Sequence, residues 1–61
     1  MSKFSVRETE NYENAYDVFD TATGDVVIIN DTWLGAIPFE DAGNAADLLN
    51  AIHGKRDGML H

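Results

Sequence analysis

The chain has 61 residues, 44% of them hydrophobic, and 11 acidic against four basic residues give it a net charge of −7. This length allows one domain at most, and the apolar content excludes an intrinsically disordered chain. The charge argues against direct binding to nucleic acid or to an anionic membrane, because both need clustered lysine and arginine.

The first predicted element is a strand over residues 3–8. Phe4 and Val6 alternate there with polar side chains, and this period of two is typical of a half-buried strand. Residues 10–14 are polar and rich in asparagine, which favours a connection to the next element.

A hairpin follows, with predicted strands over residues 15–20 and 25–30, both rich in strand-forming residues. Thr21 to Gly24 suit a tight turn in which Gly24 is left-handed, a conformation that glycine adopts without a steric cost. A hairpin closed in this way places Phe19 opposite Val27.

This register leaves both faces of the hairpin apolar near the turn. One face carries Tyr16, Val18, Val26 and Ile28, and the other carries Phe19, Val27 and Ile29. A sheet with one solvated face would alternate more cleanly. Residues 30–35 then break the strand pattern and indicate a loop.

A helix over residues 40–53 is the last predicted element. Its apolar stripe consists of Ala42, Ala45, Ala46, Leu49 and Ile52, with Leu48 broadening it. Gly54 favours a C-terminal stop, and residues 57–61 are predicted to form a frayed tail. The sequence thus predicts one α+β domain over residues 1–61, in which a three-stranded antiparallel sheet carries one C-terminal helix on one face.

Catalytic, metal and cofactor sites are not predicted, so we do not expect an enzyme. His53 and His61 lack any zinc-ligand spacing, and Asp20 to Asp25 lack the pattern of a calcium loop. No apolar run approaches the ~20 residues of a membrane helix. The absence of cysteine fits a reducing compartment, and we expect a cytoplasmic protein.

Two surface features suggest a contact site for a partner. Five carboxylates could line one region, and two aromatic residues lie in predicted loops, where exposed aromatic side chains often anchor interfaces. The candidate partner-binding residues are Glu8, Glu10, Tyr12, Glu13, Asp17, Asp31 and Trp33. Two alternatives stay open: the acidity serves only solubility, and Trp33 folds back to cap the core.

In length, acidity, lack of cysteine and layout from Phe4 to Ile52, the chain resembles anti-CRISPR proteins, small inhibitors encoded by phages and mobile elements. The resemblance implies a non-enzymatic inhibitor that presents carboxylates to the basic surface of a Cas or other nucleic-acid-binding complex in the host cytoplasm. It rests on overall character, and no residue role is transferred from it. The alternative prediction is a structural or adaptor module, or a homodimer that buries the uncovered sheet face.

Overall fold

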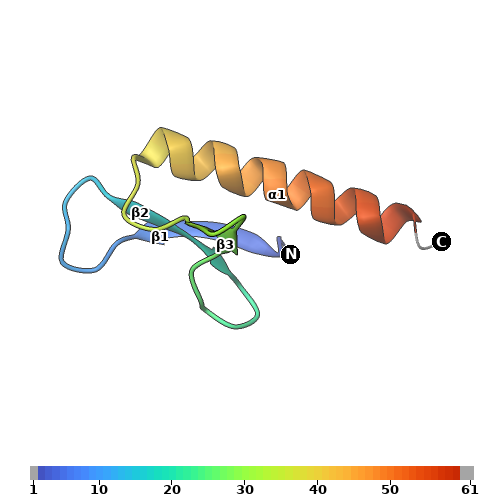
Figure 1. Cartoon of the computed structure of the whole chain (residues 1–61), viewed down its shortest axis with the longest axis horizontal. Helices are drawn as coiled ribbons and strands as arrows, with labels where there is room; N and C mark the ends of the chain where they lie inside the picture. The colour runs from blue at the N-terminus through green and yellow to red at the C-terminus, as the bar shows by residue number, and fades with distance from the viewer. Residues whose placement is uncertain (1, 60–61) are drawn as a thin grey trace.

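The computed structural model describes residues 2–59, with side chains as far as residue 54. Four strands precede one helix: β1 (Phe4–Glu8), β2 (Tyr16–Asp20), β3 (Ile28–Ile29), β4 (Thr32–Trp33) and α1 (Phe39–Met59). Figure 1 shows α1 lying across the strands and continuing past them toward the C-terminus. The α+β class with a helix packed on a sheet is confirmed. The single three-stranded sheet is wrong, because the strands form two separate antiparallel pairs.

β1 and β2 form the regular part of the fold, close to the positions that the sequence predicts. Val6 lies opposite Val18, and Glu8 lies opposite Tyr16. Phe4 and Val6 share one face, as their alternation predicts, and both pack against the core. This face of the β1–β2 pair is the one that α1 covers.

The core is small and lies between β2 and the first half of α1. Val18 and Ala42 are fully buried, and Ala46 is nearly so. Alanine brings the helix backbone close to the strands, so that a helix with short side chains still excludes water from Val18. The half-buried residues around this centre are Phe4, Val6, Tyr16, Val27, Leu34, Ile37, Ala45 and Leu49.

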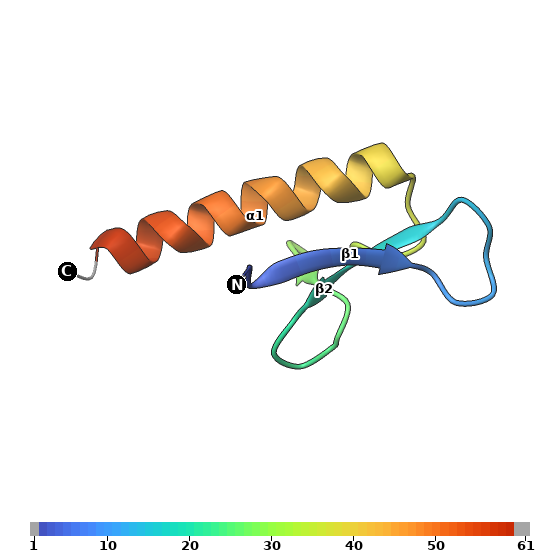
Figure 2. The same cartoon turned by 180° about the vertical axis from the view of Figure 1, so that it is seen from behind.

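The second half of α1 is longer and more exposed than predicted. Gly54 does not adopt the left-handed conformation of a helix stop, and the helix runs on to Met59. Residues 57–59 of the expected frayed tail are helical, and its last two residues lie outside the described residues. The end of the helix extends past the strands (Figures 1 and 2). Ile52 and Leu48 of the predicted buried stripe are exposed, although Leu49 between them packs against the core.

The predicted third strand is interrupted. Gly24 is left-handed as expected, with φ of 80°, but Phe19 pairs with Val26, one residue away from the predicted register. β3 then leaves β2 and pairs with β4 around a turn at Asn30 and Asp31, whose φ angles are 51° and 64°. Two successive left-handed residues make the kind of turn that closes tight hairpins, and asparagine and aspartate tolerate that conformation.

After this hairpin the chain returns to β2. Val18 accepts a hydrogen bond from the Val27 amide and donates one to the Leu34 carbonyl, both at 2.9 Å. A third bond of 3.0 Å, from the Leu34 amide to the Val27 carbonyl, closes the neck of the hairpin. Further along, Tyr16 and Ile37 exchange two backbone hydrogen bonds. Two separate pieces of chain therefore cover the outer edge of β2, where one strand was predicted.

The sheet face turned away from α1 is also less open than predicted. The Arg7 guanidinium lies 4.6 Å from the centroid of the Phe19 ring. Val27 and Ile29, expected to lie uncovered beside Phe19, are both half-buried, and Val27 packs against the core. This face is therefore partly covered, whereas Ile28 and Trp33 on the β3–β4 hairpin are mostly exposed.

Candidate functional site

The loop that joins β1 to β2 presents several of the predicted partner-binding residues in a defined conformation. The Thr9 amide donates to the Ala15 carbonyl at 2.8 Å, and the Tyr12 amide donates to the Thr9 carbonyl at 3.3 Å. Asn11 and Asn14 take left-handed backbone angles, which asparagine tolerates. These bonds and turns fix the loop, and 67% of Tyr12 stays exposed on it.

Carboxylates surround Tyr12 in this part of the chain. Glu10 and Glu13 are exposed on the same loop, and Glu8 is exposed at the end of β1. Glu8 lies opposite Tyr16, whose ring contacts the Phe39 ring with centroids 4.9 Å apart. Strand pairing and this ring contact therefore connect the acidic loop to the first residue of α1.

The start of α1 lies at the same end of the molecule as the loop (Figures 1 and 2). Phe39 is 64% exposed there, and Glu40 and Asp41 occupy the first turn of the helix. We define the acidic end as Glu8, Glu10, Tyr12, Glu13, Phe39, Glu40 and Asp41. The candidate residues predicted from the sequence include none of Phe39, Glu40 and Asp41. No local signal identifies these three residues, because their place beside the loop depends on the chain returning along β2 before the helix begins.

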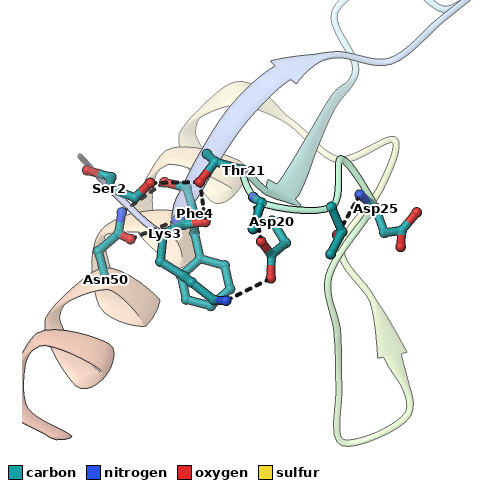
Figure 3. Close-up of polar contacts among 9 residues, drawn as sticks. Ser2, Lys3, Phe4, Asp20, Thr21, Asp25 and Asn50 are labelled. Atoms are coloured by element: carbon teal, nitrogen blue, oxygen red, sulfur yellow. Dashed lines mark hydrogen bonds and ion pairs between the residues drawn. The ribbon is translucent and has the colours of Figure 1, made fainter. Parts of the chain in front are cut away.

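No described lysine or arginine neutralises the negative charge of the acidic end. Lys3 pairs with Asp20 at 3.3 Å (Figure 3), and Arg7 pairs with Asp17 at 3.6 Å. Lys3 and Arg7 are the lysine and arginine whose side chains the structure describes, and both are thus engaged inside the fold. Within residues 2–54, no ion pair is formed by Glu8, Glu10, Glu13, Asp25, Asp31, Glu40, Asp41 or Asp47.

Asp17 does not belong to this surface, although the sequence suggested it. It is only 6% exposed. Its carboxylate accepts a hydrogen bond of 2.7 Å from the Thr9 hydroxyl and one of 3.0 Å from the Ala36 amide, besides pairing with Arg7. Burial opposes ionisation, but these two hydrogen bonds and the Arg7 charge outweigh it and hold the pKa of Asp17 below its ordinary value. Asp17 is a structural carboxylate that joins three segments of the chain.

Asp31 and Trp33 lie on the β3–β4 hairpin, away from the end that carries the β1–β2 loop (Figure 1). The predicted carboxylates therefore do not form a single region. A Cβ atom placed on Gly35 would lie 2.5 Å from the Trp33 ring, so the ring rests on the Gly35 backbone, while 55% of Trp33 remains exposed. Trp33 therefore packs against the fold with one part of its surface and presents the rest to solvent.

Two open hollows flank β1. One, of about 320 Å³, is lined by Phe4, Ile29, Leu49, Ile52 and His53, and the other, of about 290 Å³, lies along the β1 edge. Both are at or below the lower limit of typical small-ligand sites. Among the described residues, no three histidine, aspartate or glutamate side chains are placed to share a metal ion. No helix in the described part has the length and apolar character needed to span a bilayer.

Comparisons with known proteins add no relative, because no protein-family model, curated protein or solved structure matches this chain. The resemblance to anti-CRISPR proteins stays a prediction. The function proposed below therefore depends on the charge, exposure and contacts of the described residues.

Proposed function

We propose that the protein is a non-enzymatic binding domain whose acidic end contacts a basic surface on another protein. The observation that supports this most is the distribution of charge. The described lysine and arginine each pair with an aspartate of the same chain, whereas the carboxylates of the acidic end form no ion pair within residues 2–54. Clustered charge of one sign steers and selects a partner of the opposite sign.

The acidic end also offers apolar anchors for such a contact. Tyr12 and Phe39 are both about two-thirds exposed. Glu10 and Glu13 stand on either side of Tyr12 in the sequence, and Glu40 and Asp41 follow Phe39. Tyrosine is among the residues that contribute most to binding energy at interfaces. Because hydrogen bonds already fix the loop around Tyr12, little conformational entropy is lost when it binds.

A partner that holds nucleic acid fits this surface best. Proteins bind the phosphate backbone with clustered lysine and arginine, and carboxylates can occupy the same cations. The domain would then inhibit by competition, without a chemical step, like those anti-CRISPR proteins that present carboxylates where a Cas complex would hold DNA or RNA.

The test is capture of bacterial nucleic-acid-binding complexes on the immobilised protein, followed by mass spectrometry. The variant E10Q/Y12A/E13Q removes two charges and one anchor from the acidic end. The control, D25N/D31N, removes two charges from other turns. We expect the wild type and the control to retain the same complexes at low salt, and the variant to lose them.

Binding should also weaken with salt, because at 0.1 M ionic strength the attraction between exposed charges more than about 10 Å apart is largely screened, and the screening distance shortens as salt is added. The retained complexes should be released by 0.5 M salt and should lose bound nucleic acid when the protein is added. Retention that is unchanged at 0.5 M salt, or in E10Q/Y12A/E13Q, would show that the acidic end is not the contact.

A further inference from the structure

Among the described residues, no strand covers the outer edge of β1. At its two ends, the Thr21 amide donates to the Lys3 carbonyl and the Thr9 amide donates to the Ala15 carbonyl. Because hydrogen-bonded and non-bonded pairs alternate along antiparallel strands, the residues between these ends point their main-chain groups inward and outward in turn. Phe4, Val6 and Glu8 are the outward members of β1.

A side chain already occupies the first outward position. The Phe4 amide donates to Asn50 Oδ1 at 2.9 Å, and Asn50 Nδ2 donates to the Phe4 carbonyl at 3.0 Å (Figure 3). These are the two bonds that a residue on a neighbouring strand would make. No group within residues 2–59 makes them with Val6 or Glu8. The edge is therefore closed at Phe4 and open over Val6 and Glu8.

The hollow of about 290 Å³ lies beside this edge. Ser5 and Val6 line it from β1, and Gly43, Ala46 and Asp47 line it from α1. A Cβ atom on Gly43 would meet nothing within 4 Å, so the helix leaves room there for an added side chain. Asp47 is the charged residue of the lining and forms no ion pair within residues 2–54.

We propose that an extended segment of a basic partner adds to β1 as a further strand. Its main chain hydrogen-bonds to Val6 and Glu8, and a lysine or arginine side chain enters the hollow toward Asp47. Strand addition of this kind takes affinity from the main chain and specificity from alternate side chains. The basic chemistry of this partner rests on the proposed function.

A second copy of the chain fits this edge poorly. With a net charge of −7, a second copy would bring like charges together and be repelled. An antiparallel pairing centred on Val6 would also require Phe4 of each copy, whose outward groups Asn50 already holds. Charge complementarity and the Asn50 contact therefore favour a basic strand from another protein.

The probe is a capped synthetic octapeptide of alternating lysine and valine, added to the full-length protein. We expect the amides of Val6 and Glu8 to exchange about tenfold more slowly with peptide bound, as new main-chain hydrogen bonds protect them. The matched probe alternates glutamate and valine and should leave both amides unchanged.

Two variants test whether the peptide hydrogen-bonds to the outward main-chain groups of β1. E8P removes an outward N–H at a position where an edge strand tolerates proline, and E8A removes the carboxylate but keeps that N–H. We expect the peptide Kd to be about tenfold higher for E8P than for E8A, the effect of losing a hydrogen bond that only the complex makes. G43L fills the hollow from the helix and should weaken binding without unfolding the protein, which circular dichroism checks.

The outcomes separate this inference from the proposed function. If the lysine peptide shifts only the resonances of residues 10–13, or does not bind while salt-sensitive capture persists, the strand-addition proposal is wrong and the acidic-end proposal stands. The strand-addition proposal would also be wrong if the glutamate peptide slowed the exchange of the Val6 and Glu8 amides as much as the lysine peptide does. If the peptide protects Val6 and Glu8 but E10Q/Y12A/E13Q captures normally, the edge binds basic strands and the acidic end is not the contact.

Discussion

The two edges of β2 are covered in different ways. Toward β1, five successive residue pairs follow one register without interruption. On the other side, isolated bridges to Val26 and Ile37 stand on either side of a hairpin that leaves the sheet. Both sides satisfy the backbone groups of β2, but only the first does so with a regular strand.

This difference shows what holds each side in place. The β1 side depends on the alternation of apolar side chains and on one contact from the helix, made by Asn50. The other side depends on individual contacts, chiefly the Asp17 carboxylate on the Ala36 amide and the Trp33 ring on Gly35. Ala36 has a φ of 53°, a conformation that disfavours alanine, and the bond from Asp17 helps to hold it.

The largest effect should come from D17A, which breaks the irregular side. It leaves the Thr9 hydroxyl and the Ala36 amide without their acceptor and Arg7 without its partner. We expect a loss of about 3 kcal/mol in the free energy of unfolding, a large share for a domain this small. Denaturant melts measure it.

D31N is the matched control for D17A, because Asp31 is an exposed carboxylate in a turn that asparagine also suits. Its stability should stay within about 0.5 kcal/mol of the wild type. Equal losses in D17A and D31N would show that Asp17 is not a structural carboxylate.

G35A should have the next largest effect on the same side. The added methyl group would overlap the Trp33 ring, which must then leave the Gly35 backbone. We expect a loss of about 1–3 kcal/mol and a red shift of the emission of this single tryptophan. G43A is the control, since a methyl group there meets nothing, and it should gain up to about 1 kcal/mol from helix propensity. An unshifted emission in G35A would mean that the ring does not rest there.

N50A tests the regular side. It removes two hydrogen bonds that hold the edge of β1 to the helix, and we expect a net loss of about 1–2 kcal/mol. N44A has the same chemistry at an exposed helix position and should gain up to about 0.7 kcal/mol from propensity alone. Chemical denaturation of both variants measures the contribution of the contact between Asn50 and Phe4. If N50A loses no more stability than N44A, that contact does not stabilise the edge of β1.

Acid should produce the smallest effect. The pKa of Asp17 lies below its ordinary value of 3.8, so the unfolded chain binds the proton first. Its stabilisation is therefore complete above about pH 4 and is lost as the pH falls through the folded pKa. D17N should flatten this decline in melting temperature. The melting temperature of D17N should still fall somewhat in acid, because the Ala22 amide and Lys3 also lower the pKa of Asp20. Identical slopes in the wild type and D17N would contradict the assignment.

Part of the candidate site could be predicted from the sequence. Glu10, Tyr12 and Glu13 lie in a polar, asparagine-rich stretch, and such a stretch stays on the surface in almost any fold. Phe39 could not be added, because its place beside the loop requires the chain to return along β2 before the helix begins. Asp17 could not be removed, since its alternation with Tyr16 and Val18 is equally compatible with a solvated face.

The sequence by itself determined the elements that depend on neighbours along the chain. Alternation defined β1, strand-forming residues defined β2, Gly24 defined a left-handed turn, and alanine spacing defined which side of α1 meets the strands. The tertiary structure decided how the outer edge of β2 is covered, which carboxylate is buried, and which aromatic residues stay exposed. These outcomes depend on contacts such as those of the Asp17 carboxylate with the Ala36 amide and of the Trp33 ring with the Gly35 backbone. No local sequence pattern encodes them.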